Sequence, residues 1–282
     1  MGQTGRQVSV VTGATGGIGR WIALGLARAG HHVVLVCRDP GRGEAATAWL
    51  AQHAPACSAE IRLADLTSLH AARRVGEEIA AEHPRLGLLV NNAGMFAARR
   101  LLTAEGHETV LAVNHLAPFV LTDAVEGALR AGAPSRIVNV GSSTSDRARI
   151  DPEDLELTRR WGMVRAYGRS KLAMMMATFA RAERLRGSGV VANVVHPGAV
   201  ATGLIREPGS IGVAWRLMAP FLRSEKQGAD TPLHVALAPD WAATTGAYVK
   251  DRAAVRPNRR ALDPALVERV DAITRSLAAR TG

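Results

Sequence analysis

The chain contains 282 residues, of which 47% are hydrophobic and 21% charged, and this composition excludes intrinsic disorder over most of its length. Its net charge of +10 comes from dispersed basic residues, and only 4% of the residues are aromatic, so few stacking platforms for nucleic acid exist. No apolar stretch reaches the roughly 18–20 residues that span a bilayer, and two cysteines suit a reducing compartment. We therefore expect a cytoplasmic globular protein that binds neither nucleic acid nor a membrane.

Short apolar segments alternate with longer segments of helical periodicity along most of the chain. The apolar segments, each predicted to be a strand, are residues 8–12, 33–37, 61–63, 86–90, 137–140, 190–195 and 247–249. The segments with apolar residues three and four apart, predicted to be helices, are residues 18–29, 43–53, 69–82, 105–129 and 164–185. Repeated βαβ units of this kind predict a doubly wound α/β fold, with about seven parallel strands and helices on both faces.

Two segments toward the C-terminal end depart from this alternation. Residues 203–240 contain four prolines and short apolar stretches, and we expect them to form a lid over the substrate. Their apolar side chains, between Leu204 and Leu222, favour a hydrophobic substrate; alternatively, they pack into the domain or a dimer interface. The tail, residues 257–282, contains an amphipathic helix after Asp263-Pro264 that either docks on the domain or mediates homo-oligomer assembly. We expect residues 1–282 to form one domain.

A glycine-rich segment follows the first predicted strand and opens the first predicted helix. It reads Thr12-Gly13-Ala14-Thr15-Gly16-Gly17-Ile18-Gly19, in the position that a dinucleotide-binding turn requires. Gly13 permits the tight turn, Gly17 lets the backbone approach a pyrophosphate, and Gly19 lets the helix pack closely on the sheet. The cofactor contacts expected from this turn come from Thr12, Gly13, Thr15, Gly17, Ile18 and Gly19.

The end of the second predicted strand indicates which dinucleotide binds. An acidic residue there binds the ribose 2′-hydroxyl of NAD, whereas an arginine accommodates the 2′-phosphate of NADP. Cys37 cannot take the acidic role, whereas Arg38 offers a planar set of donors for phosphate. Arg20 and Arg42 are its candidate neighbours. We therefore favour NADP(H); the alternative is that Asp39 reaches the ribose and NAD(H) binds.

Two residues after the third predicted strand are expected to border the adenine of the cofactor. Asp65 and Leu66 lie there, at the edge where open α/β sheets bind ligands. Asp65 also fits the N-cap region of the following helix, and the two roles are compatible.

A tyrosine and a lysine, Tyr167 and Lys171, are four residues apart in the last long predicted helix and therefore lie on one helical face. With two tyrosines and three lysines in the chain, this spacing has a chance expectation of roughly 2%. The ammonium, together with a cationic nicotinamide, would stabilise the phenolate and make Tyr167 usable as an acid or base near neutral pH. Ser142, beyond the fifth predicted strand, is placed to hydrogen-bond a carbonyl group. A serine nucleophile is the alternative, but the Gly-x-Ser-x-Gly motif is absent.

These motifs, with Asn91-Asn92-Ala93-Gly94, Asn114 and Pro197-Gly198-Ala199-Val200-Ala201-Thr202, resemble the classical short-chain dehydrogenase/reductase family, in order and over most of the chain. The resemblance implies a Rossmann-type fold. It implies a catalytic set, with Asn114 completing a proton relay, that consists of Asn114, Ser142, Tyr167 and Lys171. It also implies cofactor contacts from Asn91, Ala93, Tyr167, Lys171, Pro197, Gly198, Val200 and Thr202.

Within the family, three stretches look most like the retinol dehydrogenase-like branch. They are Gly19-Arg20, Cys37-Arg38-Asp39 and Val113-Asn114-His115-Leu116. The membrane anchor usual in that branch is not visible in the sequence, so we expect neither membrane attachment nor a retinoid substrate on this ground.

We therefore expect an enzyme that transfers hydride between NADP(H) and the carbon of an alcohol or carbonyl group. The first alternative is a sugar-nucleotide epimerase or dehydratase, since extended relatives of the family share Tyr-x-x-x-Lys, but the glycine spacing argues against it. The second is a non-catalytic NADP-sensing protein, which would not need all four catalytic residues. We predict no metal site, because His107-Glu108 does not continue into His-Glu-x-x-His.

Overall fold

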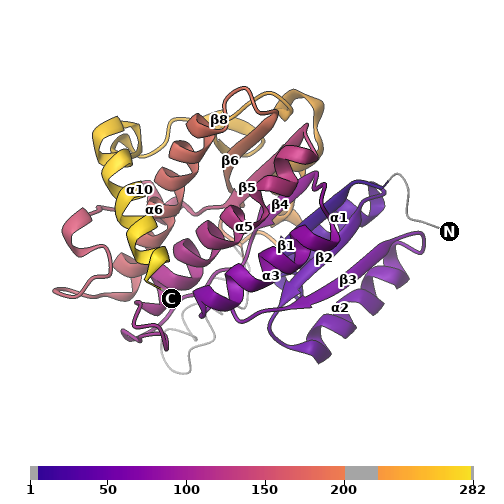
Figure 1. Ribbon diagram of the computed structural model, residues 1–282, viewed down its shortest axis with the longest axis horizontal. Helices are drawn as coiled ribbons and strands as arrows, with labels where there is room; N and C mark the ends of the chain where they lie inside the picture. Colours follow the sequence, from indigo (N-terminus) through magenta and orange to yellow (C-terminus); the bar gives the residue numbers. More distant parts are fainter. Residues whose placement is uncertain (1–5, 201–221, 281–282) are drawn as a thin grey trace.

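A single eight-stranded sheet runs through the centre of the molecule (Figure 1). The computed structural model describes residues 6–200 and 222–280. The strands have the spatial order β3-β2-β1-β4-β5-β6-β7-β8, and β1 to β7 are parallel. In chain order they are β1 (Val8–Thr12), β2 (His32–Cys37), β3 (Ser58–Leu63), β4 (Leu88–Asn91), β5 (Ser135–Val140), β6 (Val190–His196), β7 (Tyr248–Lys250) and β8 (Ala253–Val255). The predicted doubly wound α/β fold is confirmed, with one strand more than the expected seven.

The additional strand is β8, three exposed residues that pair antiparallel with β7. Asp251 and Arg252 connect the two strands with φ of 50° and 65°, the left-handed backbone of a tight hairpin turn. Because the usual hairpin dipeptides, Asn-Gly and Asp-Gly, are not used at this turn, the sequence pattern did not indicate it.

Helices cover both faces of the sheet. On one face lie α1 (Gly17–Arg28), α2 (Pro40–His53) and α9 (Asp230–Leu237); on the other lie α3 (Leu69–Glu82), α5 (Ala117–Ala131) and α6 (Met163–Arg184). Alternate residues of one strand serve the two layers, since Val11 of β1 packs with α1 and Val10 packs with α3 and α5. Both side chains are fully buried. Burial on both faces explains why the central strands are continuous apolar segments.

The four predicted helices 18–29, 43–53, 69–82 and 164–185 are confirmed to within three residues at each end, as α1, α2, α3 and α6. The largest difference is at α2, which begins at Pro40. The Asp39 carboxylate accepts a hydrogen bond from the Arg42 backbone N–H (2.8 Å) and caps the helix, and Pro40 suits its first turn.

The predicted helix 105–129 was wrong at its beginning. The helix begins as α4 (Thr109–Leu111), widens into the π-helical turn η1 (Ala112–Leu116), and continues as α5. Glu108 caps α4, because its carboxylate accepts a hydrogen bond from the Leu111 backbone N–H at 2.7 Å. Gly106, with φ of 83°, belongs to the turn before this cap. The helix was predicted to begin too early because the apolar periodicity of the sequence continues through this turn and through the cap at Glu108.

The chain after β6 leads into the predicted lid. Residues 201–221 lie outside the described part of the chain, and α8 (Glu225–Gly228), α9 and the 3-10 turn η5 (Pro239–Trp241) follow. The two flanks of that segment lie side by side, because the Arg223 backbone N–H donates to the Ala199 carbonyl oxygen at 2.8 Å. The prediction that residues 203–240 form a substrate lid stays a prediction. The same holds for the expectation that residues 1–282 form one domain.

The C-terminal tail docks on the domain. After the 3-10 turn η6 (Arg259–Leu262), α10 (Pro264–Ala279) packs against α6, where it forms the yellow helix of Figure 1. The Asp263 carboxylate caps α10 by accepting hydrogen bonds from the backbone N–H groups of Ala265 and Leu266. The predicted tail helix is confirmed, and homo-oligomer assembly stays a prediction. Across residues 6–200 and 222–280, none of the helices has the length and apolar character that crossing a membrane requires.

We predict that Gly19→Ala lowers the free energy of unfolding by about 1–3 kcal/mol, the range typical of overpacking. A Cβ at Gly19 would lie 2.3 Å from the Gly13 carbonyl oxygen and 2.4 Å from Asn92 Nδ2. Gly127→Ala in α5 is the control, because no described atom beyond its chain neighbours and the adjacent backbone of its own helix lies within 4 Å of a Cβ added there. Urea unfolding measures both variants, and a Gly19→Ala protein as stable as the control would contradict this close packing.

Candidate active site

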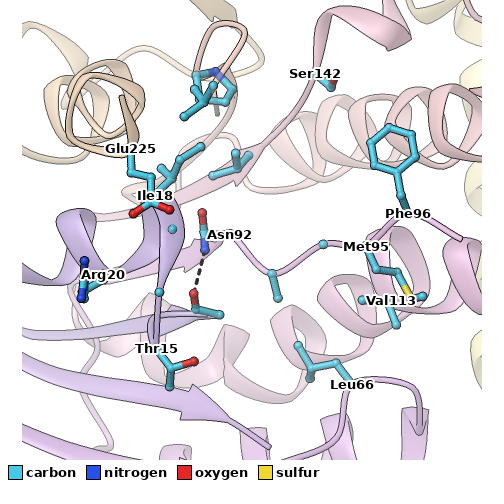
Figure 2. Close-up of a pocket in the computed structure, with 18 of the residues that line it drawn as sticks. Thr15, Ile18, Arg20, Leu66, Asn92, Met95, Phe96, Val113, Ser142 and Glu225 are labelled. Carbon is cyan, nitrogen blue, oxygen red and sulfur yellow. Dashed lines mark hydrogen bonds between the residues drawn. The ribbon is translucent and has the colours of Figure 1, made fainter. Parts of the chain in front are cut away.

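A cavity of about 940 Å³ opens at the carboxyl ends of β1, β2, β4, β5 and β6 (Figure 2). In doubly wound sheets ligands bind at this edge, where the strand order reverses, here between β1 and β4. Most of the predicted site residues line the cavity: Gly13, Thr15, Gly17, Ile18, Arg38, Asp65, Leu66, Ala93, Ser142, Tyr167, Lys171, Pro197, Gly198 and Val200.

The turn between β1 and α1 forms one wall of the cavity. Gly13 and Gly17 have φ of 65° and 58°, values that residues with a Cβ adopt only with strain. Gly16 precedes α1, and no side chain of the described residues caps this helix, so its first backbone N–H groups are available to an anion. A Cβ at Gly17 would meet no described atom within 4 Å, which leaves room for a bound group there. The turn fits the pyrophosphate of a dinucleotide.

Hydrogen bonds fix this turn to the loop after β4. Thr12 Oγ1 accepts hydrogen bonds from the backbone N–H groups of Asn92 and Ala93, both at 3.0 Å. Asn92 Nδ2 donates to the carbonyl oxygens of Thr12 (3.0 Å) and Gly13 (3.2 Å), and Figure 2 shows this side chain reaching toward the turn. Thr12 therefore acts through its neighbours instead of lining the cavity. Asn92 was not among the predicted site residues, although its place in Asn91-Asn92-Ala93-Gly94 was a signal.

Three arginines surround the end of the cavity near β2. Arg20, Arg38 and Arg42 all line it, and Arg38 is exposed. The Arg20 guanidinium lies 4.5 Å from the centre of the Trp49 ring, which holds it against α2. Asp39 also lines this end, and its Oδ1 caps α2 by accepting a hydrogen bond from the Arg42 backbone N–H. This end of the cavity is suited to a phosphate.

Asp65 lies at the predicted edge of the cavity, but it does not cap the following helix. It lines the cavity, and its Oδ1 accepts hydrogen bonds from the backbone N–H and the hydroxyl of Thr67, each at 2.9 Å. The adjacent helix α3 is capped instead by Ser68, whose hydroxyl accepts from the Ala71 backbone N–H.

Tyr167 and Lys171 project from α6 into the cavity that Ser142, after β5, also lines. The Lys171 ammonium donates to the Val140 carbonyl oxygen at 2.7 Å, and its Nζ lies 5.9 Å from the centre of the Tyr167 ring. Burial lowers the pKa of Lys171 to about 8. Burial also raises the pKa of Tyr167 to about 12, although a hydrogen bond with Ser142 acts in the opposite direction.

The expectation that Lys171 helps to lower the pKa of Tyr167 toward neutrality is therefore corrected for the protein by itself. Desolvation of the phenol raises this pKa, and the Lys171 ammonium donates to a backbone carbonyl and not to the tyrosine hydroxyl. The added positive charge of an oxidised nicotinamide is then the remaining source of the expected shift.

Asn114 lies in the π-helical turn η1 and is fully buried. Its Oδ1 accepts from the Met95 backbone N–H (2.8 Å), and its Nδ2 donates to the Met95 carbonyl oxygen and to Ser170 Oγ, both at 3.0 Å. It does not line the cavity, but it approaches Lys171 at Gly94. A Cβ at Gly94 would lie 3.3 Å from Asn114 Oδ1 and 3.5 Å from Lys171 Nζ.

Asn91, Gly19 and Thr202 are predicted site residues that the structure does not place in the cavity wall. Asn91 Nδ2 donates to Asn139 Oδ1 (2.8 Å) and Thr122 Oγ1 (3.1 Å), so this side chain joins β4 to β5 and α5. Gly19 is buried against the turn after β1. Thr202 lies outside the described residues.

Several lining residues were missed by sequence reasoning: Met95, Phe96, Val113 and Glu225. Phe96 stacks on the Tyr167 ring with 3.6 Å between ring centroids and an angle of 15° between planes. The only local signal for Met95 and Phe96 was their position directly after Asn91-Asn92-Ala93-Gly94. Glu225 lies after residues 201–221, and we see no sequence pattern that would have placed it here.

Comparisons with known proteins agree with this architecture. The model of the short chain dehydrogenase family matches residues 7–209. Retinol dehydrogenase 12 of Mus musculus is 38% identical over 264 residues, which cover 94% of this chain and 84% of that protein. A solved structure of an uncharacterised protein from Mycobacterium paratuberculosis has a TM-score of 0.78 at 28% identity and covers 97% of this chain and 93% of its own.

A second solved structure, a blue fluorescent protein from a metagenomic library in complex with NADPH, has a TM-score of 0.69 at 28% identity. It covers 87% of this chain and 96% of its own. The chain therefore belongs to the short-chain dehydrogenase/reductase family. Within it, the similarity to retinol dehydrogenases 12 and 14 places the chain in the retinol dehydrogenase-like branch. It is an oxidoreductase of the class that acts on CH–OH and C=O groups with a nicotinamide cofactor.

His115, next to Asn114, joins the π-helical turn to the tail helix. Thr274 of α10 donates to the Val270 carbonyl oxygen, so His115 Nε2 must donate to Thr274 Oγ1, at 2.8 Å. Nδ1 then carries no proton, and no described residue donates a hydrogen bond to it. Burial lowers the pKa of His115 to about 3 because a charged ring has no partner here.

We predict that His115→Gln reduces the loss of stability between pH 7 and pH 5. Below the ordinary histidine pKa near 6.5, the unfolded chain binds a proton that buried His115 refuses, so stability falls by up to about 1.4 kcal/mol per pH unit. The difference in unfolding free energy between the two pH values should therefore shrink by up to about 2 kcal/mol in the variant. Urea unfolding at both pH values measures it, with exposed His70→Gln as the control. An unchanged pH dependence in His115→Gln would show that this ring is protonated in the folded protein.

Proposed function

We propose that this chain is an NADP(H)-dependent oxidoreductase that interconverts a hydrophobic ketone or aldehyde and the corresponding alcohol. The observation that carries this proposal is that Ser142, Tyr167 and Lys171 line the same cavity as the glycine turn before α1. Two hydroxyl groups beside a buried ammonium can bind a carbonyl oxygen, supply its proton and stabilise the charge that develops on it.

In the reductive direction, Ser142 and Tyr167 would donate hydrogen bonds to the carbonyl oxygen. Burial raises the pKa of Tyr167 to about 12, so the hydroxyl is protonated at neutral pH, as a general acid must be. Burial lowers the pKa of Lys171 to about 8, which leaves most of the side chain protonated at pH 7 and able to stabilise the phenolate after proton transfer. Asn114 would join the return path of the proton at Gly94, where it approaches the Lys171 ammonium.

The cofactor would be held along the edge of the sheet from β2 to β6. The turn before α1 would bind the pyrophosphate, and Pro197 and Gly198 after β6 would lie beside the nicotinamide. When bound, the nicotinamide supplies or accepts the hydride. The related blue fluorescent protein, solved with NADPH, supports this choice of cofactor.

NADP(H) is favoured over NAD(H) by the charges around the adenosine end of the cavity. Arg20, Arg38 and Arg42 line this end together with Asp39, whose Oδ1 caps α2. Three guanidinium groups match the geometry of phosphate oxygens. These contacts support recognition of the 2′-phosphate.

The substrate is proposed to be hydrophobic because the cavity is apolar beside Tyr167. Met95, Phe96 and Val113 line this part, and Phe96 lies flat against the tyrosine ring. The similar retinol dehydrogenase 12 carries the name of an apolar alcohol, which supports the same class of substrate. Burying each additional methylene of a substrate contributes about 0.8 kcal/mol.

Tyr167→Phe is expected to lower kcat for carbonyl reduction by at least about 100-fold, because general acid catalysis contributes roughly 10²–10⁴-fold. The phenyl ring keeps its packing against Phe96, so NADPH binding should persist. Steady-state oxidation of NADPH with straight-chain aldehydes measures this effect.

In the wild type, kcat/KM should rise with chain length as methylenes enter the apolar part of the cavity.

Tyr248→Phe is the matched control, since Tyr248 is the other of the two tyrosines and lies outside the cavity. Its hydroxyl donates to Asp146 Oδ1 at 2.9 Å, so the control also loses one phenolic hydrogen bond. Near-normal turnover by Tyr167→Phe would exclude Tyr167 as the acid. A kcat/KM that falls with chain length in the wild type would instead reject the hydrophobic substrate and leave the reaction class intact.

We expect the wild type to bind NADPH more tightly than NADH, and Arg38→Asp to weaken NADPH binding by about 10–100-fold. This range corresponds to the loss of one charge-assisted hydrogen bond of about 1.5–3 kcal/mol. Fluorescence titration of both cofactors measures the preference. Arg85→Asp is the control, because it makes the same charge change at an exposed position outside the cavity. Equal affinities for the two cofactors in the wild type would argue against the assignment of Arg38.

A further inference from the structure

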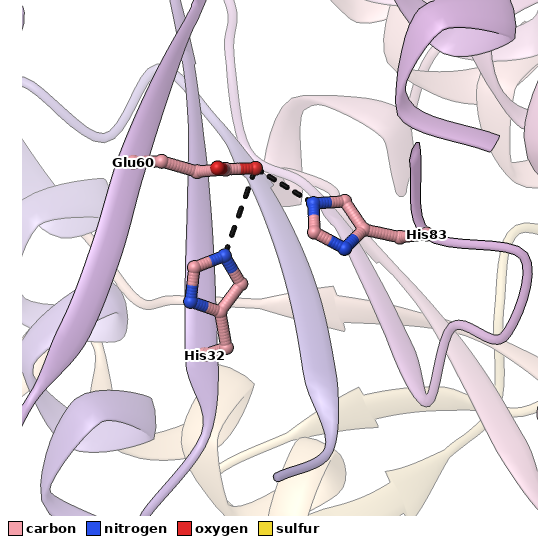
Figure 3. A group of neighbouring side chains, drawn as sticks. All are labelled: His32, Glu60 and His83. Atoms are coloured by element: carbon pink, nitrogen blue, oxygen red, sulfur yellow. Dashed lines mark hydrogen bonds and ion pairs between the residues drawn. The ribbon is translucent and has the colours of Figure 1, made fainter. Parts of the chain in front are cut away.

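Three potential metal ligands meet on the face of the sheet that α3 covers, away from the cavity (Figure 3). His32 is the first residue of β2, Glu60 lies within the neighbouring strand β3, and His83 directly follows α3 as its C-cap. Their ligand atoms all lie within 4.8 Å of one another. None of the three lines the cavity, so the oxidoreductase function does not account for this cluster.

Both histidine rings direct Nε2 toward the same carboxylate oxygen, Glu60 Oε1. His83 Nε2 lies 2.7 Å from this oxygen and His32 Nε2 lies 3.6 Å from it. Figure 3 shows both rings turned toward the same end of the Glu60 carboxylate. A tetrahedral ion with ligands about 2.0–2.2 Å away separates neighbouring ligands by about 3.3–3.6 Å. The His32 distance matches this separation, and the His83 distance is shorter and would have to lengthen around an ion.

His32 provides an independent observation that points to a ligand. Its side chain is 5% exposed, and its Nδ1 hydrogen-bonds Ser58 Oγ at 2.7 Å. Among the described residues, no group forms a hydrogen bond with its Nε2. If Nδ1 donates to Ser58, then Nε2 directs a lone pair toward a carboxylate, an arrangement that a cation between them would satisfy. Ser58 would then fix the ring in the tautomer that binds a metal.

The surrounding charges favour a cation. Arg62 Nη2 lies 3.2 Å from Glu60 Oε1 and also pairs with Glu82. With neutral histidines, Glu60 and Glu82 contribute two negative charges and Arg62 one positive charge, so the cluster keeps a net charge of −1. Zn²⁺ would displace the proton that His83 Nε2 donates to Glu60, because a metal ligand must be deprotonated.

We propose that His32, Glu60 and His83 bind one Zn²⁺ ion at the side of the sheet remote from the cavity. Two imidazoles and one carboxylate form a known ligand set for Zn²⁺, with water in the fourth position. Glu60 and His83 are 28% and 16% exposed, so the ion can enter from solvent and keep that water. The bound ion would join β2, β3 and the end of α3, and would act on stability without contacting the carbonyl-reducing site.

The test uses the full chain without a polyhistidine tag, freed of metal by a chelator. Titration with Zn²⁺ in a calorimeter should give one ion per chain, and Zn²⁺ should raise the melting temperature. Co²⁺ should give the visible absorption of a four-coordinate N/O site. His83→Ala should weaken Zn²⁺ binding by more than about 100-fold, beyond the 10–100-fold typical of losing only a supporting hydrogen bond.

Two further variants make the result decisive. Glu60→Gln keeps the shape of the side chain but replaces the anionic ligand with an amide, and it should lose the ion as His83→Ala does. Exposed His70→Ala removes a histidine outside the cluster and should bind Zn²⁺ like the wild type. The melting temperature without metal shows that each variant is folded. Wild-type affinity in a folded Glu60→Gln protein, or no binding by the wild type, would overturn the proposal.

Discussion

The close approach of α1 to the turn after β1 is the constraint on which the site depends. Gly19 leaves no room for a Cβ beside the Gly13 carbonyl oxygen, and the Asn92 amide hydrogen-bonds that same oxygen. The turn after β1, the helix α1 and the loop after β4 therefore form one unit at the point where the strand order reverses. Arg38 approaches this unit from the β2 side, and Tyr167 approaches from the β5 and β6 side. The phosphate-binding and carbonyl-binding ends of the cavity are thus placed relative to a single fixed centre.

Burial of Tyr167 and Lys171 sets the electrostatics of the reacting end. Desolvation disfavours the charged form of each group, so the pKa of the phenol rises to about 12 and that of the ammonium falls to about 8. The first shift preserves the proton that carbonyl reduction consumes. The second limits the charge that stabilises the phenolate, because Lys171 loses its proton as the pH rises through 8. Alcohol oxidation, which needs the phenolate, therefore depends more strongly on additional positive charge in the cavity than carbonyl reduction does.

Local spacing determined how much of this site could be predicted from the sequence. Tyr167 and Lys171 share a helical face because they are four residues apart, and the glycine turn is contiguous, so both were recognised. The π-helical turn at Asn114 has no comparable signature, because one extra residue in a turn hardly changes the apolar periodicity. Phe96 stacks on Tyr167 across 71 positions of sequence, a contact that only the folded chain creates. The same reason hid the histidine and glutamate cluster, whose members come from three separate elements.

The parallel pair of strands β2 and β3 joins the proposed zinc site, at the amino ends of the strands, to the cofactor end of the cavity, at their carboxyl ends. Six residue pairs join these strands, from His32 beside Ser58 to Cys37 beside Leu63. The first pair belongs to the proposed zinc site, and the last pair directly precedes Arg38 and the adenosine end of the cavity. An ion at the first pair would restrain the strands that carry the phosphate-binding residues. Tyr167 lies on α6, beyond β1 and β4, and shares none of these pairs. Metal occupancy would therefore affect stability and cofactor binding more readily than proton transfer.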